Sequence, residues 1–381
     1  MGVNTVEKRT KKPFIQRKWW KITALILAVV LLFFVICWVL PRPQSTEENI
    51  FVVGKNNRPL LIAHGGGNGE FPDNTLEAFI NAYGVDKNVM METDVSMTKD
   101  GKIILSHDTT LGRKTNIDEE IIKVDYSWLM ESSNGIDFNY NNASLMTDGR
   151  WNAGISITNL IKYKTNEYAA EQKEVSPTDV NFQPAINDGL LPSNYTTTFK
   201  TAFGTQRSGA LFKATLLEEL IATFPQNTVN VEIKQSGEIG IAALAEVIKV
   251  IERQNAFDRV VVASFHKEVY NKMVEYQKNS HESLMYSPEQ SGVIKFFILQ
   301  LLGIDVFFNE KITVFQVPMK QMGIKVATRG FIRKAHKHKI AVHFWTINNP
   351  ADMRRLCDIG ADGIMTDNPS NLFKVLNEKF S

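Results

Sequence analysis

Short apolar runs alternate with helical patterns along most of the chain, and this alternation limits the possible folds more than any other feature. Strands that alternate with helices predict a parallel sheet covered by helices. The runs that predict strands are Leu60–Ala63, Val89–Val95, Lys102–Ser106, Val229–Ile233, Val260–Ala263, Ser283–Tyr286, Thr313–Val317, Ala341–Trp345 and Gly363–Thr366. The runs that predict helices are Asn74–Val85, Leu216–Phe224, Ile239–Asn255, Lys267–Lys278, Gly330–Lys339, Pro350–Asp358 and Ser370–Glu378.

Nine candidate strands for eight places predict a TIM (β/α)₈ barrel with one strand extra or wrongly assigned. A doubly wound open sheet is the architectural alternative. Residues 59–381 are more than the roughly 250 that such a barrel usually needs. The excess lies at about 113–210, which is rich in Asn, Thr, Ser, Asp and Tyr. We predict a small insertion subdomain there, with a helix over Ile155–Lys173.

The N-terminal region carries a separate signal. Residues 1–21 hold seven basic residues and one acid, and residues 22–40 form an apolar run without a charge. Roughly 20 apolar residues cross a bilayer as a helix, and a basic flank stays in the cytoplasm. We predict a basic cytoplasmic tail at 1–21, a single transmembrane helix at 22–40 in the cell membrane, a polar linker at 41–58, and a barrel domain at 59–381 outside the cell. A cleaved signal peptide is the alternative, but the run is long for one and no Ala-x-Ala-like site follows it.

Charge and cysteine content exclude two classes of function. The chain carries +2 and the basic tail +6, so residues 22–381 carry −4, which argues against a nucleic-acid partner. The two cysteines are Cys37 and Cys357, and the first lies in the apolar run. The outer domain therefore has one thiol, which can form neither an internal disulfide nor a cysteine zinc site.

The first candidate strand ends in His64, within the stretch "IAHGGGNGEFPDNT". Glycines 65–67 let a ligand approach the backbone closely. Asn74 is the expected N-cap of the next helix, with Glu77 at its third position. A helix N-terminus beside a glycine-rich loop suits a phosphate. Taken alone, a histidine here is more often structural than catalytic.

Acidic side chains gather on two further strands. In "VMMETDVSM", Glu92 and Asp94 are two residues apart and share one face. In "VNVEIKQ", Glu232 and Lys234 share a face in the same way. A solvent-facing edge, or a simple pair between Glu232 and Lys234, would be the structural explanation. In a barrel mouth, three carboxylates suit one hard divalent cation, Ca²⁺ or Mg²⁺, and Lys234 suits an anionic substrate group.

Other strand ends also carry polar or aromatic residues. "KIILSHD" ends in His107, "HFWTIN" carries Trp345, and "GIMTDNP" carries Asp367, which is expected to cap a helix. Strand ends meet at one face of a barrel. Two histidines, three carboxylates and a lysine there favour phosphodiester cleavage, with one His as base and the other as acid. The role of His343 stays open, and the remaining histidines are expected at the surface: His266, His281, His336 and His338.

Taken in order, these motifs resemble the glycerophosphodiester phosphodiesterases. That family's pattern runs His-Arg-Gly, Pro-Glu-Asn-Thr, Glu-x-Asp-Val, Thr-x-Asp-Gly and His-Asp. This chain has "HGG", "PDNT", "ETDV", "TKDG" and "HD" in the same order, followed by "VEIK", "SF", "QVP", "WTIN" and "GADGIMTDNP". The resemblance covers roughly residues 59–108 and 211–376.

The resemblance implies a TIM barrel that cleaves glycerophosphodiesters to glycerol 3-phosphate and an alcohol. It implies one divalent cation on Glu92, Asp94 and Glu232, with His64 and His107 as the acid–base pair. One departure concerns the family's phosphate-contacting Arg, which is Gly65 here. The expected substrate- and phosphate-binding set is Gly65, Lys234, Trp345 and Arg113. Trp345 would be a lid over the pocket, with a core aromatic as its alternative, and Arg113 is a candidate substitute for the missing guanidinium.

Three alternatives remain open at this stage. A phospholipase D that acts on lysolipids or sphingolipids would share the architecture, and the apolar run Phe296–Phe308 could then touch acyl chains, although such a run is more often a buried barrel helix and strand. A glycerol-phosphate polymer at the cell surface is another candidate substrate. A membrane-anchored binding module that has lost catalysis is the alternative of a different class, which the missing Arg permits.

Overall fold

The computed structural model describes the chain with several gaps. The described residues are 14–44, 48–54, 57–71, 73–115, 117–131, 134, 136, 183–191, 199–200, 206–207, 214–280, 283–321 and 323–380. Most of the predicted insertion, including its helix over Ile155–Lys173, lies outside them, as does His281.

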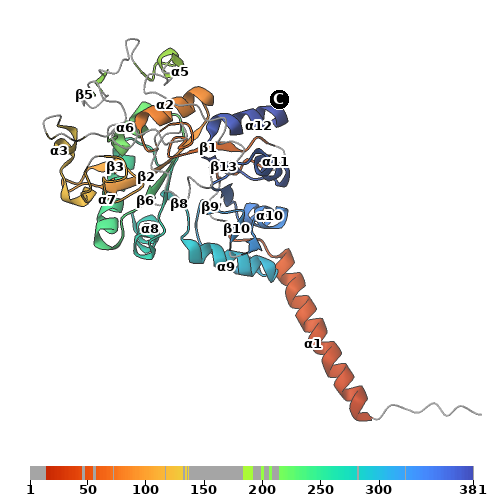
Figure 1. The fold of residues 1–381 in the computed structure, drawn as a ribbon. Coiled ribbons are helices and arrows are strands. Elements are labelled where there is room, and N and C mark those ends of the chain that lie inside the picture. The colour runs from red at the N-terminus through yellow and green to blue at the C-terminus, as the bar shows by residue number, and fades with distance from the viewer. Residues whose placement is uncertain are drawn as a thin grey trace, which may run out of the picture.

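The described chain contains a barrel of eight parallel strands (Figure 1). They are β1 (Leu60–His64), β2 (Met90–Met97), β6 (Val229–Ile233), β7 (Val260–Ala263), β8 (Met285–Tyr286), β9 (Val314–Val317), β12 (Ala341–Phe344) and β13 (Gly363–Thr366). They pair in the order β8-β7-β6-β2-β1-β13-β12-β9. The two ends of this order meet where the backbone N–H of Thr313 donates to the carbonyl of Tyr286 at 2.9 Å, so the barrel is nearly closed.

The TIM-barrel prediction is thus confirmed, and the doubly wound alternative is excluded. The ninth candidate strand is β3 (Ile103–Leu105), which pairs antiparallel with β2 outside the barrel order. The tight Asp-Gly turn between β2 and β3 allows only this hairpin, because a parallel pair needs a long crossover.

Eight helices surround the barrel. They are α2 (Leu76–Val85), α6 (Leu217–Thr223), α7 (Gly237–Arg253), α8 (Lys267–Asn279), α9 (Gln290–Leu301), α10 (Arg329–Lys337), α11 (Pro350–Ile359) and α12 (Pro369–Phe380). The smaller described elements are η1 (Ile121–Lys123), α3 (Tyr126–Met130), α5 (Gln183–Asn187), β4 (Phe199–Lys200), β5 (Gln206–Arg207), η5 (Asp305–Phe307), β10 (Lys320–Gln321) and β11 (Ile324–Lys325).

The alternation of side chains along each strand separates two cores. On β6, Val229, Val231 and Ile233 point outward and are fully buried against the helices. Asn230 and Glu232 alternate with them and therefore face the barrel interior. A second, smaller core fills the lower interior, and its fully buried or nearly buried members are Phe51, Ile62, Met90, Val261, Val314, Ala341 and Met365.

The segment before β1 closes the floor of the barrel. Phe51 is fully buried, and its ring lies edge-on to that of His343, with 6.0 Å between centroids. Asn49 donates from its side-chain amide to the carbonyls of Thr313 (2.7 Å) and Lys339 (2.8 Å), at the starts of β9 and β12. The polar linker predicted from the sequence is therefore packed against the barrel in its described part.

Before that segment lies α1 (Phe14–Val39), which points away from the barrel (Figure 1). Among the described residues it is the one helix that is long and apolar enough to cross a membrane, over Trp19–Val39.

One surface prediction is wrong. His338 is 1% exposed, because its ring packs between the edges of Phe296 and Phe308 and its Nδ1 bonds the carbonyl of Pro43. The residues around His338 are hydrophilic and therefore predicted an exposed position. The chain N-terminal to the barrel covers His338, and a local sequence pattern cannot predict that contact.

Candidate active site

Six of the predicted site residues line one cavity of about 290 Å³. The strand register explains this, because His64 is aligned with Glu92 and Glu92 with Asn230, while Asp94 is aligned with Glu232. His64, Glu92 and Asn230 therefore lie at one level on three neighbouring strands. Asp94 and Glu232 lie at the next level toward the carboxyl ends of the strands. The predicted residues that line the cavity are His64, Glu92, His107, Glu232, Lys234 and Trp345.

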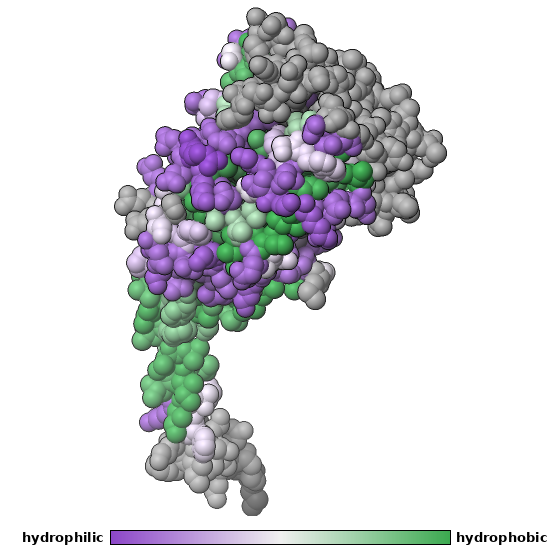
Figure 2. Space-filling view, turned by 90° about the vertical axis from the view of Figure 1, so that its left-hand side faces the viewer, coloured by the Kyte–Doolittle hydropathy of each residue, from purple (hydrophilic) through white to green (hydrophobic). Residues whose placement is uncertain are grey.

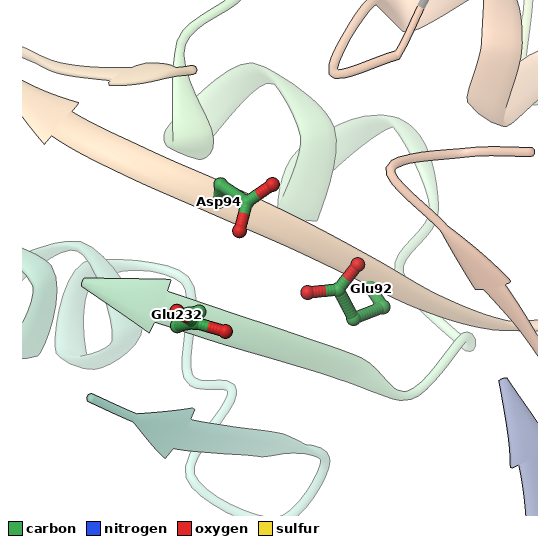
Figure 3. Close-up of side chains that lie close together, drawn as sticks. All are labelled: Glu92, Asp94 and Glu232. Carbon is green, nitrogen blue, oxygen red and sulfur yellow. The ribbon is translucent and has the colours of Figure 1, made fainter. Parts of the chain in front are cut away.

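The three acids form a compact group on adjacent strands. Figure 3 shows Glu92 and Asp94 on β2 and Glu232 on β6, with their carboxylates close together. One oxygen of each lies within 4.8 Å of the others. Glu92 and Asp94 are 2% and 3% exposed, so water screens their charges poorly. These are the oxygen ligands that Ca²⁺ and Mg²⁺ prefer.

Lys234 offsets part of this negative charge. Its Nζ lies 2.6 Å from Glu232 Oε1 and 2.9 Å from Asp94 Oδ1. Burial raises the pKa of Glu92, and the neighbouring Asp94 charge raises it further, to about 8. Burial also raises the pKa of Glu232, and the positive charge of Lys234 offsets only part of this rise. When all three acids are ionised, they exceed the single ammonium of Lys234 by two negative charges, so the chemistry of the donor set fits a divalent cation.

His64 is held by an acid from the other end of the chain. Its Nδ1 lies 2.6 Å from Asp367 Oδ1, and Asp367 Oδ2 accepts a bond from the Asn348 amide at 2.7 Å. Burial lowers the pKa of His64, but the bond to Asp367 and the charges of Asp367, Glu92 and Asp94 outweigh it and raise the pKa to about 10. Asp367, expected as a helix cap, is thus the partner that orients and charges His64.

His107 belongs to a chain of charged contacts. Its Nδ1 lies 2.7 Å from Asp108 Oδ1, and Arg113 Nε donates to Asp108 Oδ2 at 2.6 Å. The two terminal nitrogens of Arg113 donate to the carboxylate of Asp73 at 3.0 and 2.9 Å. Burial raises the pKa of Asp73, but Arg113 and Lys114 outweigh it and hold the pKa well below its usual range.

Gly65 and Arg113 lie outside the described residues that line the cavity. Gly65 has φ +57°, and a Cβ there would stand 2.9 Å from the Cβ of Asp73. Its backbone N–H instead donates to Glu92 Oε2 at 2.9 Å. A side chain at position 65 would therefore point toward Asp73. Arg113, from the loop after β3, brings its guanidinium to that same acid.

Asn74 differs from its predicted role. Thr75 is the N-cap of α2, and its Oγ1 accepts a bond from the N–H of Ala78. Asn74, at φ +55°, donates instead to Asp94 Oδ2 at 3.0 Å and accepts from the Asp94 N–H at 3.0 Å. An Asn-Thr pair offers two plausible caps, and only the course of the loop selects one. The amide of Asn74 then fixes an acid of the carboxylate group.

An aromatic pair forms one wall of the cavity. Phe265 follows β7 and is 61% exposed, and its ring lies edge-on to Trp345 at 6.2 Å between centroids. Both rings line the cavity together with Pro288. Phe265 belongs to the "SF" motif, from which the sequence predicted no role in the site. His343, whose role stayed open, lies fully buried below, and burial lowers its pKa to about 4.

Comparisons with known proteins agree with this architecture. The model of the glycerophosphoryl diester phosphodiesterase family matches residues 64–371. The lysophospholipase D GDPD1 of Rattus norvegicus is 23% identical over 337 residues, which cover 83% of this chain and 85% of that protein. A glycerophosphodiester phosphodiesterase of Bacillus subtilis (strain 168) is 24% identical over 356 residues, covering 92% and 95%.

The fold is also found among solved structures. A phosphodiesterase of Oleispira antarctica, solved in complex with the product sn-glycerol-3-phosphate, superposes with a TM-score of 0.51. It is 16% identical and covers 84% of this chain and 97% of its own. At this identity the structural likeness supports the fold, while the family model spans most of the chain. The chain therefore belongs to the glycerophosphoryl diester phosphodiesterase family and, with it, to the phosphoric diester hydrolases.

Proposed function

We propose that this chain is a divalent-cation-dependent enzyme that cleaves glycerophosphodiesters to glycerol 3-phosphate and an alcohol. The observation that carries the proposal is that His64, His107, Glu92 and Glu232 line one cavity, and that Asp94 forms a compact carboxylate group with the two glutamates. Each histidine is held through Nδ1 by an aspartate, which leaves Nε2 as the nitrogen for proton transfer.

Glu92, Asp94 and Glu232 would hold one cation, Ca²⁺ or Mg²⁺. When bound, such a cation supplies charge neutralisation at a phosphate oxygen. Lys234, already in the cavity, binds a second part of the phosphate charge. Trp345 provides an apolar wall for the carbon skeleton, and the backbone N–H of Gly65 holds the carboxylate of Glu92.

We assign the two histidines opposite roles. His64 carries the raised pKa, so it is protonated at neutral pH and donates its proton to the oxygen of the leaving alcohol. His107 accepts the proton of the attacking hydroxyl. The attacking group is the glycerol hydroxyl next to the ester, which gives a cyclic phosphate that water then opens, or a water molecule directly.

Arg113 acts in this scheme as a positioning residue. Its guanidinium joins Asp73 to Asp108, and Asp108 in turn holds His107. The sequence resemblance suggested a phosphate contact for Arg113 instead, and the two roles predict different kinetics. A catalytically inactive module is disfavoured, because both histidines line one cavity with Glu92 and Glu232, and Asp94 belongs to the same carboxylate group.

We further propose that α1 anchors the enzyme in the cell membrane as a single pass, with the basic N-terminal tail in the cytoplasm and the barrel outside. The seven Lys and Arg residues directly before the apolar run support this orientation, because basic flanks of a membrane helix stay in the cytoplasm.

A lysophospholipase D activity is the second candidate. It is favoured by the exposed aromatic Phe265 beside Trp345 at the cavity, which suits a substrate with an apolar portion. The rat relative named above carries this activity in its name.

One assay separates these candidates. The full chain in detergent is incubated with glycerophosphocholine, glycerophosphoglycerol or lysophosphatidylcholine, with Ca²⁺, Mg²⁺ or EDTA. The products are glycerol 3-phosphate, lysophosphatidate or a cyclic phosphate. Release of glycerol 3-phosphate that stops with EDTA and with His64→Ala, but continues with the control His336→Ala on α10, supports the main proposal. Turnover of the lysolipid alone supports the second candidate, and no turnover with bound metal supports an inactive module.

A further inference from the structure

The helix α9 exposes a stripe of large apolar side chains. Ile294, Ile298, Leu301 and Leu302 are spaced by four, three and one residues, so they lie along one face of the helix. Leu301 is 66% exposed, and Phe307 in the adjoining η5 is 56% exposed. These five residues, here called the outer stripe, remain in contact with solvent in the described structure.

The outer stripe lies beside the end of α1. Figure 1 shows α9 along the edge of the barrel from which α1 leaves, and α1 contacts η5. Directly after α1, the buried guanidinium of Arg42 donates from Nε to Asp305 Oδ2 at 3.0 Å. Arg42 also donates to the carbonyls of Trp38 (2.9 Å) and Leu40 (2.7 Å), the last residues of the apolar run.

Further contacts prevent the barrel from swinging freely on its anchor. Asp305 also pairs with Lys334 of α10, and His338 bonds the carbonyl of Pro43 at 2.8 Å. Asn49 and Phe51 then hold the same segment across the barrel floor. The end of α1 is therefore fixed next to η5 and α9. In Figure 2 the hydrophobic surface of α1 continues onto the base of the domain.

The other end of α9 begins at the cavity. Pro288 lines the cavity, and α9 starts two residues later at Gln290. A helix of 12 residues is about 18 Å long. The same helix thus connects the rim of the cavity with the region where α1 enters the domain.

We propose that the outer stripe lies on the bilayer surface, so that α9 is embedded in the headgroup region and the rim of the cavity stands beside lipid headgroups. A helix that lies in a membrane interface buries its apolar face about 5–10 Å into the boundary between headgroups and acyl chains. The partner is a lipid bilayer because the stripe continues the surface of an apolar helix of membrane-spanning length. This inference rests on the proposed anchor, and it adds a second membrane contact that orients the cavity.

The test uses the full chain in phosphatidylcholine–phosphatidylglycerol vesicles. Spin labels are attached to Leu301→Cys in the outer stripe, to Leu31→Cys in α1, and to Trp128→Cys in α3, an exposed apolar position away from α1 (Figure 1). The native thiols Cys37 and Cys357 are buried, and an unsubstituted sample measures any labelling of them. Collision with oxygen, which concentrates in lipid, is compared with collision with a water-soluble nickel chelate.

The inference expects the labels at 31 and 301 to collide more with oxygen, and the label at 128 to collide more with the nickel chelate. A label at 301 that is open to the chelate, with 31 in lipid, overturns the inference and leaves the anchor intact. A label at 31 that is open to the chelate removes the anchor and the inference together. A label at 301 that is shielded from both reagents indicates a second copy or another protein on the stripe, which also overturns it.

A kinetic arm tests the consequence for substrate access. Ile298→Glu places a charge on the outer stripe, and Ile239→Glu on α7 is the matched control at another exposed isoleucine. We expect Ile298→Glu to lower turnover of lysolipid in vesicles several-fold relative to turnover of soluble glycerophosphocholine, and the control to leave this ratio unchanged. An equal ratio in both variants contradicts the proposed placement of the cavity rim. Loss of both activities in the parent chain would count against the proposed function, while the spin labels still decide the membrane contact.

Discussion

Arg113 separates two explanations of the proposed site, because each predicts a different kinetic effect. If Arg113 positions Asp108 and thereby His107, Arg113→Met lowers kcat about 10- to 100-fold, the usual cost of losing an orienting partner. The KM for a glycerophosphodiester then changes little. If Arg113 binds phosphate in place of the residue missing at Gly65, KM rises and kcat falls less.

The structure also sets the expected loss of stability. Arg113 donates two bonds to Asp73, whose side chain is 5% exposed, and one to Asp108. Removing one partner of a buried ion pair costs about 3–5 kcal/mol. Lys114 still lies 3.3 Å from Asp73 Oδ1 in the variant, so we expect the lower end, about 3 kcal/mol.

The double variant Arg113→Met/Asp73→Asn separates folding from catalysis. It removes the uncompensated charge at position 73 but also takes the carboxylate partner from Lys114, so only part of the lost unfolding free energy should return, while Asp108 still lacks its guanidinium partner. Urea unfolding and the kcat and KM of both variants are compared with those of the parent. Recovery of the parental kcat in the double variant would refute the positioning role. A rise in KM with an unchanged kcat in Arg113→Met would show instead that Arg113 binds the phosphate of the substrate.

Three further predictions follow from the site and the barrel floor. Asp367→Asn removes the negative charge that raises the pKa of His64 and leaves at most a neutral amide oxygen as its partner. Since His64 acts as the protonated acid, the fall in kcat at alkaline pH should begin about one pH unit lower or more, and an unmoved profile would contradict the assignment. EDTA should abolish turnover, and Glu232→Gln should weaken Ca²⁺ or Mg²⁺ binding at least about 10-fold in calorimetry, whereas undiminished affinity would place the cation elsewhere. Phe51→Ala should destabilise the barrel by about 3–5 kcal/mol in thermal unfolding, and a change below about 1 kcal/mol would show that Phe51 does not fill the floor.

Local patterns in the sequence account for the barrel and for the composition of the cavity. Strand periodicity alone places Glu92 with Asp94, and Glu232 with Lys234, on common faces, because side chains alternate along a strand. The rule that functional residues collect at the carboxyl ends of parallel strands then brings His64 to the same cavity. The extra strand β3 also follows from sequence, since only a hairpin can use the short turn before it.

Tertiary structure alone decided the partners that tune these residues. His64 meets Asp367 across 303 residues, and Arg42 meets Asp305 across 263, and no local periodicity predicts such pairs. Closure of the barrel brings β13 beside β1, and with it Asp367 to His64. In the same way, an apolar run in α9 is compatible with either a core or a surface until packing decides which face is covered. The sequence by itself determined which chemical groups reach the cavity, because strand periodicity is local, whereas their charge states and the exposed outer stripe depend on distant segments that meet only in the folded chain.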